Sequence, residues 1–242
     1  MLLKYKCLLL LLIPLFLINE AYAQKTGEAI YQAQLIENDN DYLQQTYLKS
    51  LPNAEDYISE AEFILKFKDD KSEFKLHDIL YSNNAKVELA ISFVGYNGRL
   101  IRNENQVLSD TRDTPVHQGK WSEVAFNVDW EITQESKQID DFQAFKAFGT
   151  VNEEVFNQST GEFETQNSII EAWFCPSIPI PHGPLGYGDL PGLILELHTS
   201  AASFGLVKLN LNKKNEIEVV DNKDILTKLQ LRMIEQKELK GF

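Results

Sequence analysis

Cysteine is scarce in this sequence, which limits how the folded chain can be stabilised. Only two of the 242 residues are cysteines, Cys7 and Cys175. Cys7 lies in an apolar stretch near the amino terminus that we expect to be removed, so the mature chain keeps Cys175 alone. A single cysteine cannot close an intrachain disulfide, even in an oxidising compartment. The stability of the mature chain therefore has to come from packing.

Positive charge is also in short supply. The sequence has 23 Lys and Arg against 36 Asp and Glu, a formal net charge of -13. Loss of the first 23 residues would remove Lys4, Lys6 and Glu20 and make the balance slightly more negative. Because an acidic chain repels phosphate backbones and anionic lipid surfaces, we expect no nucleic-acid partner.

Long apolar runs are missing beyond the amino terminus. Lys4 and Lys6 precede an apolar run over residues 7–18, and Ala21-Tyr22-Ala23 follows it. This arrangement predicts a secretory signal peptide cleaved before Gln24. Cys7 lies inside the apolar run, which argues against a lipid anchor. No later run reaches the roughly 18 apolar residues of a membrane-spanning helix, so we expect no transmembrane segment in the mature chain.

These features predict the organisation and location of the protein. We expect a signal peptide at residues 1–23 and a single domain over residues 24–242, which is long enough to bury one sizeable core. We also expect an exported protein that is periplasmic, extracellular or associated with the outer membrane.

Alternating apolar and polar residues are what the mature chain has most of. This period of two is typical of half-buried strands. The strands that it predicts cover residues 27–36, 63–68, 74–79, 124–131, 163–175, 193–197, 203–207 and 217–219. Residues 124–131 alternate most clearly. Residues 85–93 also alternate and favour a strand, although part of that segment would tolerate a helix. A polar turn at residues 69–72 joins two of these strands.

Helical spacing is limited to two segments, residues 41–51 and 224–237. We therefore predict a mainly β, β-rich α+β fold: a curved antiparallel sheet, or a partial barrel or sandwich, with one or two flanking helices. No regular crossover helix follows the strands, which argues against parallel winding.

The rest of the chain is organised around a loop rich in proline and glycine. Four prolines stand between residues 176 and 184, and proline cannot donate a hydrogen bond to a sheet, so we expect this path to run outside the interior of the sheet. The glycines of residues 183–188 exclude a helix there. Pro191-Gly192 predicts a turn into the strand at residues 193–197. If Gly192 has a positive φ, its change to Val would strain the backbone by roughly 1 to 3 kcal/mol.

Two segments carry a resemblance to a known family. Residues 188–194, Gly-Asp-Leu-Pro-Gly-Leu-Ile, resemble the signature of the GLPGLI family, secreted Bacteroidetes-type proteins without an established activity. Asp189 stands where that family has its first glycine. Residues 172–176, Ala-Trp-Phe-Cys-Pro, resemble the family's Ala-Trp-Tyr-Thr-Pro. Family members commonly carry a cysteine within residues 138–151, where this sequence has none. The resemblance is dense between residues 130 and 197 and implies no defined reaction.

The candidate chemical groups near the loop are Cys175, His182, Asp189 and His198. Their spacings fit no metal-ligand template, so we expect no metal and no cofactor. Cys175 and His182 could form a nucleophile and its base, but no helix amino terminus is evident to activate the thiol. Glu196 and His198 share one strand parity, which is consistent with a solvated face.

Two functions follow from the sequence. The first is a secreted or periplasmic noncatalytic module that binds an envelope protein or an apolar ligand and could assist outer-membrane transport. The second is a hydrolase or thiol enzyme that uses Cys175 and His182. For the first, the expected binding residues lie in and beside the loop: Trp173, His182, Tyr187, Asp189, Pro191 and Gly192.

Overall fold

The computed structural model describes residues 26–36, 46, 49, 51, 53–77, 85–103, 106–112, 119–124, 127–157, 162–227, 230–231 and 233–234. The expected signal peptide lies outside these residues. So does most of the helix expected over residues 41–51, of which Thr46 and Lys49 are described and helical. Within the described residues, no helix is both long enough and apolar enough to cross a membrane.

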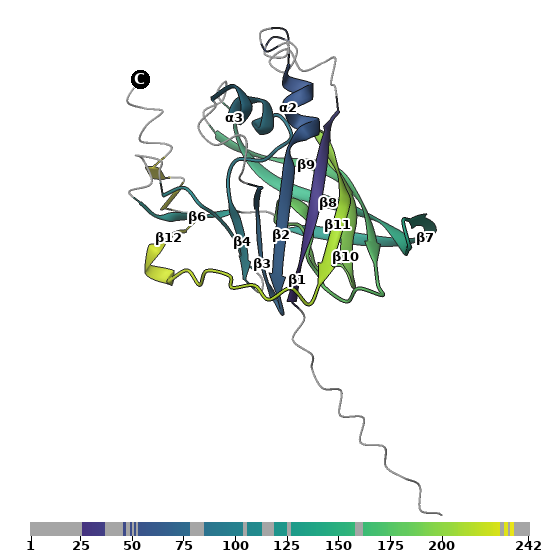
Figure 1. Cartoon of the computed structure of the whole chain (residues 1–242). Helices are drawn as coiled ribbons and strands as arrows, with labels where there is room; N and C mark the ends of the chain where they lie inside the picture. The colour runs from purple at the N-terminus through teal and green to yellow at the C-terminus, as the bar shows by residue number, and fades with distance from the viewer. Residues whose placement is uncertain are drawn as a thin grey trace, which may run out of the picture.

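One large, curved sheet dominates the described residues (Figure 1). Its twelve strands follow the order β12-β6-β5-β4-β3-β2-β1-β11-β10-β9-β8-β7. All neighbouring pairs are antiparallel except β12 with β6. The strands are β1 (Thr26–Leu35), β2 (Glu62–Lys68), β3 (Lys71–Leu76), β4 (Leu100–Asn103), β5 (Gln106–Ser109), β6 (Trp121–Val124), β7 (Val128–Ile139), β8 (Phe142–Asn157), β9 (Glu162–Cys175), β10 (Leu193–His198), β11 (Ala202–Leu211) and β12 (Ile225–Leu226). The predicted β-rich α+β fold is confirmed.

Sequence alternation defines the two faces of this sheet. On β1, Ala29, Tyr31 and Ala33 are fully buried, whereas Gln32 and Gln34 are exposed. We call the side of Gln32 and Gln34 the solvent face. The predicted hairpin of β2 and β3 is also present, and Asp69 begins its turn with a φ of 57°. Strand parity therefore positions side chains as the sequence predicts.

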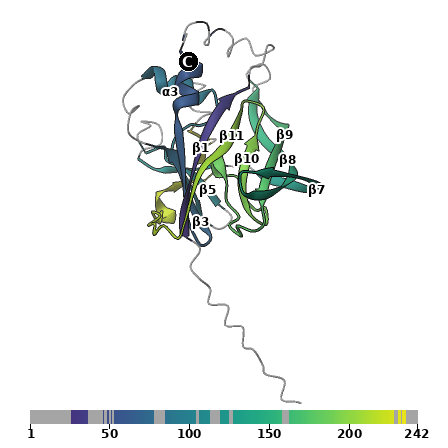
Figure 2. The same cartoon turned by 45° about the vertical axis from the view of Figure 1, so that its right-hand side comes forward.

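Aromatic side chains fill the inner side of the sheet. Phe63 stacks on Phe74 with ring centroids 5.7 Å apart, and Phe204 meets Phe63 edge-on at 5.3 Å. The helices α2 (Ala54–Glu60) and α3 (Ala85–Ser92) lie together at one end of the sheet (Figures 1 and 2). The three phenylalanines and the buried residues of both helices belong to one continuous cluster. The described inner side of the sheet is therefore packed with side chains.

The strand favoured over residues 85–93 is wrong, because this segment forms α3. Val87, Ala90 and Ile91 are buried at helical spacing, while Leu89, which a strand would have placed on the same face as Val87, is 40% exposed. Apolar residues at 87, 89 and 91 fit a strand, but residues 87 and 91 also fall on one face of a helix. The residues between them are good helix formers, which favours the helix over the strand.

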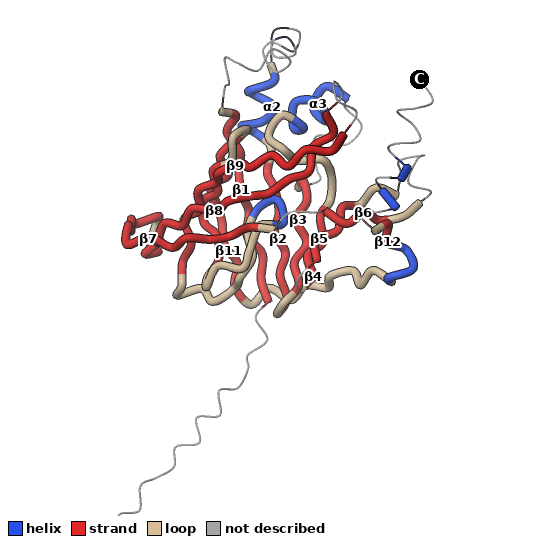
Figure 3. Tube along the Cα trace, turned by 180° about the vertical axis from the view of Figure 1, so that it is seen from behind, coloured by secondary structure: helices blue, strands red, loops and turns tan. Residues whose placement is uncertain are grey.

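The single strand expected at residues 124–131 is confirmed only in part, because residues 128–131 belong to β7 whereas Val124 is the last residue of β6. β6 ends at Val124 and β7 begins at Val128, and the two strands lie near opposite ends of the sheet order. Figure 3 shows β6 beside β12 on one side and the β7–β8 hairpin projecting on the other. Alternation of apolar and polar residues does not reveal that the chain leaves one strand position for another.

Two expectations near the carboxyl terminus need correction. Residues 217–219 form no strand. The helix expected to begin at residue 224 is preceded by a short 3-10 turn, η3 (Asn222–Asp224), and by β12. After β12, the first described helical residue is residue 230. Ile217 and Val220 instead pack against a small second core around Ile101, Leu108 and Trp121.

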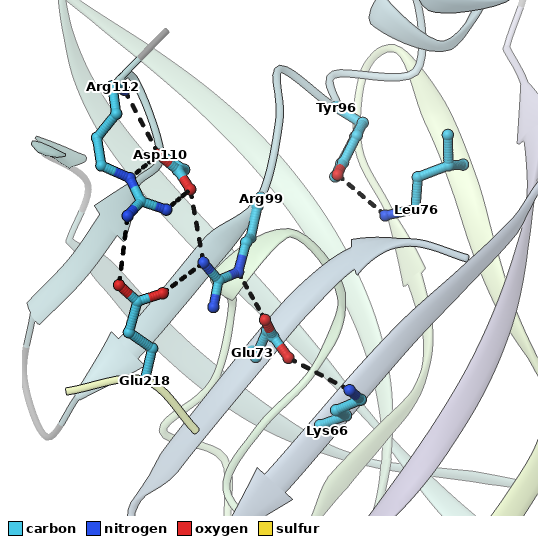
Figure 4. Close-up of polar contacts among 8 residues, drawn as sticks. All are labelled: Lys66, Glu73, Leu76, Tyr96, Arg99, Asp110, Arg112 and Glu218. Atoms are coloured by element: carbon cyan, nitrogen blue, oxygen red, sulfur yellow. Dashed lines mark hydrogen bonds and ion pairs between the residues drawn. The ribbon is translucent and has the colours of Figure 1, made fainter. Parts of the chain in front are cut away.

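A polar network fastens this carboxyl-terminal segment, residues 212–224, across the solvent face (Figure 4). Glu218 lies 2.7 Å from Nη1 of Arg99 and 3.5 Å from Nη1 of Arg112. Arg99 also reaches the buried Glu73 at 2.6 Å, and Asp110 pairs with Arg112 at 2.6 Å. We call these five residues, with Lys66, the strap network.

Hydrogen bonds within the strap network shift the pKa values of two of its groups. Burial lowers the pKa of Arg99, but hydrogen bonds to Glu218 and Glu73 outweigh it and raise that pKa above its usual value. The hydrogen bond from Arg112 holds the pKa of Asp110 below its usual value, against the opposite effect of burial. Both groups are therefore charged at neutral pH, and the positive and negative charges of the strap network balance.

Candidate functional site

The loop predicted from the prolines leaves β9 at Cys175 and returns at β10. We call residues 176–192 the signature loop. As expected, it runs outside the named strands, and an isolated bridge joins His182 to Gly188. The expected absence of helix is wrong for three residues, because Pro184–Gly186 forms a 3-10 turn, η2. Leu185 inside this turn has a φ of 55°, so the turn does not propagate as a regular helix.

Left-handed backbone is concentrated in the signature loop. The φ values are 55° at Leu185, 77° at Gly186 and 68° at Asp189. Asp tolerates this conformation better than most residues other than Gly, because its short side chain can hydrogen-bond locally. This explains why Asp189 can replace the first glycine of the family signature that the loop resembles.

Arg102 of β4 holds the two left-handed parts of the loop together. Its side chain is buried, donates from Nη1 to the carbonyl oxygen of Gly186 at 2.8 Å, and pairs through Nη2 with Asp189 Oδ2 at 2.5 Å. The Asp189 side chain itself is 67% exposed. A buried cation thus reaches outward to an accessible carboxylate across the strained turn. Strained backbone of this kind persists only where its surroundings hold it in place.

Trp130 attaches the signature loop to the edge strand β7. Its indole Nε1 donates to the carbonyl oxygen of Gly188 at 2.9 Å. Gly149 on β8 makes room for this indole, because an added Cβ there would lie 2.9 Å from the ring and 2.6 Å from Val128. The loop therefore fixes the position of β7 through a side chain on β7 itself.

His182 is a buried residue of the signature loop and is 1% exposed. Its Nε2 is 3.2 Å from the carbonyl oxygen of Asp69, which can only accept, so Nε2 carries the proton. Nδ1 is buried and has no hydrogen-bond partner among the described residues. The pKa of His182 is lowered to about 4, chiefly by burial and also by the nearby Arg102, against the opposite effect of the hydrogen bond to Asp69, so the ring is neutral at pH 7. His182 thus ties the β2–β3 turn to the loop.

Cys175 is fully buried, and its Sγ lies 3.0 Å from Ser177 Oγ. The His182 imidazole hydrogen-bonds to the carbonyl oxygen of Asp69 instead, so the described contacts do not join the thiol to an imidazole base. Gly192 has no positive φ, which corrects the premise of the strain argument. A Cβ at Gly192 would instead lie 2.2 Å from the Cys175 carbonyl oxygen, so close backbone approach requires glycine there.

The structure places the expected binding residues in two groups. Five belong to the signature loop, and of these Asp189 and Pro191 are exposed, whereas His182, Tyr187 and Gly192 are buried. Trp173 lies apart on the solvent face of β9, where its Nε1 donates to Glu171 at 2.8 Å. The Lys137 ammonium sits 4.3 Å from the Trp173 ring centroid.

Two residues of the loop's surroundings were missed from the sequence, Arg102 and Trp130. They lie 87 and 58 residues from their partners, and no local pattern marks such distant pairs. The signal that was available for Arg102 is its position beside Ile101 in a short apolar strand, where an unpaired charge would be costly. In the described part of the chain, no three His, Cys, Asp or Glu side chains are grouped to hold a metal ion.

The strand that the loop supports is exposed along one side. Within the described residues β7 is the last strand of the sheet and pairs only with β8. Its register shifts between Ile132 and Ser136, so the regular part of the free edge runs from Val128 to Ile132. Asp129 and Glu131 are exposed there, and Ile132 is 52% exposed. Unpaired main-chain groups at such an edge can accept another strand.

Comparison with known proteins finds a family model over this region of the chain. The model, described as "Protein of unknown function (Porph_ging)", matches residues 130–196. The matched segment begins at Trp130 on β7, includes β8, β9 and the signature loop, and ends at Glu196 on β10. The match is compatible with the resemblance to GLPGLI proteins but does not establish that label.

Solved structures with a similar chain path were also found. A structure of PNGF-II in the C2 space group is 16% identical, with a TM-score of 0.46, and the match covers 87% of this chain and 33% of that chain. A P21 crystal form is 14% identical, with a TM-score of 0.45 and the same coverage. This chain therefore spans about a third of the length of those structures. No curated protein matches the chain. Residues 130–196 are thus similar to a family whose function is unknown.

Proposed function

We propose that the chain is an exported, noncatalytic module of the cell envelope that binds a protein partner by accepting an extended segment of it at the free edge of β7. The observation that carries the proposal is this edge, a strand of 12 residues, whereas the opposite edge of the described sheet is the two-residue β12. Main-chain hydrogen bonds supply affinity in this mode of recognition, and alternate side chains supply specificity. An accessory role in outer-membrane transport is one setting for such a module.

The charge of β7 specifies the partner. Asp129, Glu131 and Glu135 are exposed on it, and the whole chain is strongly acidic. Cross-strand pairs of opposite charge stabilise neighbouring strands, whereas like charges destabilise them. The partner segment is therefore extended and carries Lys or Arg at alternate positions.

The other functions considered from the sequence have less support. An apolar ligand would need space on the inner side of the sheet, which Phe63, Phe74 and Phe204 fill in the described core. A thiol enzyme would need an accessible thiolate near a base, whereas Cys175 is fully buried and hydrogen-bonded to the Ser177 hydroxyl. Both observations favour the protein-binding proposal.

Hydrogen exchange with a defined probe tests the proposal. We expect a soluble peptide of alternating Val and Lys to slow exchange of main-chain amides within residues 128–132 and a peptide of alternating Val and Glu to leave them unchanged. The double variant Asp129→Lys, Glu131→Lys should reverse this preference. The matched control, Glu216→Lys, Asp224→Lys, makes the same charge change at exposed residues away from β7. Equal protection by both peptides, or by neither, would contradict the proposal.

Site-specific photo-crosslinking tests the native partner. A photoreactive residue at position 131 should crosslink in the intact envelope to an extended segment that carries Lys or Arg. The same residue at position 216 serves as the control. Crosslinks that map to folded or acidic surfaces, or that form equally from position 216, would argue against edge addition.

A further inference from the structure

Gly205 in β11 differs from the other described glycines. Gly95, Gly98, Gly119 and Gly186 have positive φ, and Gly27, Gly149, Gly183, Gly188 and Gly192 lack room for a Cβ. At Gly205 the φ is ordinary, and a Cβ would meet no described atom within 4 Å. Glycine in a strand interior weakens the strand, by roughly 0.5–1 kcal/mol relative to Ala in such positions. The described part of the chain therefore gives no reason for glycine at this position, whereas the approach of a bound group would.

The sheet register places polar side chains on both sides of Gly205. One row across the strands is Gln32 on β1, Gly205 on β11 and Glu196 on β10, and the next row is Gln34, Ser203 and His198. These positions share the solvent face and border a hollow of about 330 Å³. With strands about 4.8 Å apart and about 7 Å between alternate residues, the four corner positions frame an area of roughly 7 by 10 Å.

Charge in this hollow is already matched within the protein. Glu196 Oε2 pairs with Lys137 Nζ at 2.5 Å and lies 3.5 Å from His198 Nε2. The two carboxamides and the Ser203 hydroxyl can each donate and accept hydrogen bonds. Among the described residues that line the hollow, a charged ligand would find no free opposite charge, whereas a neutral ligand with many hydroxyl groups would find matching donors and acceptors.

We propose that the hollow over Gly205 is a binding site for one neutral, hydroxyl-rich ring, such as a monosaccharide unit. Gly205 forms its floor, Gln32 and Gln34 line one side, and Glu196 and His198 line the other. This site is separate from the edge of β7 and goes beyond the proposed function. The polar side chains of the hollow suit a neutral sugar, whereas the edge of β7 suits an extended basic peptide.

Titration by nuclear magnetic resonance tests the site with defined probes. We expect glucose, galactose or mannose to shift the side-chain amide signals of Gln32 and Gln34 in the intact mature chain, with saturation. Glucosamine and glucuronate, which carry opposite charges, should bind roughly tenfold more weakly, a difference of about 1.4 kcal/mol. The proposal fails if none of the neutral sugars shifts these signals, or if either charged sugar binds as well as the best neutral one.

A filled hollow gives an independent test. Gly205→Gln places a side chain in the hollow, so sugar binding should be lost while the thermal melt stays close to that of the wild type. Leu211→Gln, on the same strand at a position 48% exposed and outside the hollow, should keep sugar binding. If Gly205→Gln does not fold, Gln34→Leu should weaken binding instead, since Gln34 is exposed. Undiminished sugar binding by folded Gly205→Gln or by Gln34→Leu would overturn the proposal. None of the three variants alters residues 128–132 of β7.

Discussion

The signature loop and the carboxyl-terminal segment are both held by arginines, but in opposite ways. Arg102 is buried and has one carboxylate partner, Asp189, within a loop of left-handed backbone. Arg99 has three carboxylate partners in the strap network, and no residue of the described carboxyl-terminal segment except Asn212 has a positive φ. The signature loop therefore depends on a few contacts, each without a substitute. The strap network has several contacts, so the loss of one leaves the others in place.

This difference matches what each region does for the sheet. The carboxyl-terminal segment covers the small second core and delivers β12 to one edge. The signature loop supports the other edge through Trp130 and leaves that edge without a strand partner in the described residues. Substitutions in the loop should accordingly cost more stability than substitutions in the strap.

The largest effect is expected for Gly192→Val. Its new side chain would begin 2.2 Å from the Cys175 carbonyl oxygen, so the end of β9 and the start of β10 would have to separate. We expect a loss of about 3 kcal/mol, at the upper end of the cost of overpacking. Chemical denaturation measures it, with Gly205→Ala, where the φ is ordinary and no described atom lies within 4 Å of the added Cβ, as the control. Wild-type stability in Gly192→Val would show that the loop tolerates displacement.

Acid should affect the loop next most strongly, through His182. Its folded pKa of about 4 lies below the unfolded value near 6.5, so the unfolded chain binds more protons between these limits. Stability from this group is complete above pH 6.5 and falls as the pH drops toward 4, by up to about 3 kcal/mol.

The control for His182 is His182→Gln, which removes the titration and keeps a polar side chain. Denaturation measured from pH 7 to pH 4.5 should show a clearly shallower pH dependence in this variant than in the wild type. Parallel pH profiles would contradict the buried, neutral state of His182. Carboxylates outside the loop titrate in both proteins, so the difference between the two profiles isolates the imidazole.

Arg102 and Asp189 should come third. Arg102→Met leaves the Gly186 carbonyl without its donor and removes the ion pair, which we expect to cost about 2 kcal/mol. Asp189→Ala should cost about 1 to 2 kcal/mol, because Ala has to adopt a left-handed φ. Asp189→Gly loses the same ion pair without that strain, so it should be the milder change. Denaturation curves that rank Gly below Ala in stability would contradict the role assigned to the φ of 68°.

The parts of this architecture that could be predicted from sequence are those encoded by neighbouring residues. Alternation identified β1, the β2–β3 hairpin and β9, and the prolines predicted a loop outside the sheet. The same local signal failed for α3, where two periods overlap, and for β6 and β7, where the chain changes strand position. The expected binding residues showed where the loop lies, but the burial of His182 and Tyr187 was not predicted, and the contacts of β3 and β4 with η2 of the loop join segments that are far apart in sequence.

Long-range partners are the part that could not be predicted. The pair of Arg102 with Asp189 and the bond of Trp130 to Gly188 exist because the signature loop contacts β4 and β7 in the folded chain. The hollow over Gly205 likewise needs the register of three strands that are far apart in sequence. Single-residue patterns contain no information about which strands pair.

The smallest effect is expected in the strap network, and salt should separate it from the loop. Arg112 and Glu218 are partly exposed, at 41% and 38% of their side chains, and Arg99 keeps its bond to Glu218 when Arg112 is lost. Arg112→Gln should therefore cost less than about 1 kcal/mol. At 1 M salt the screening length falls to about 3 Å, so most of this difference should disappear. The cost of Arg102→Met should persist there, because the buried bond to the Gly186 carbonyl is shielded from ions. Denaturation of both variants in low and high salt measures this, and equal salt sensitivity would mean that the two regions are held in the same way.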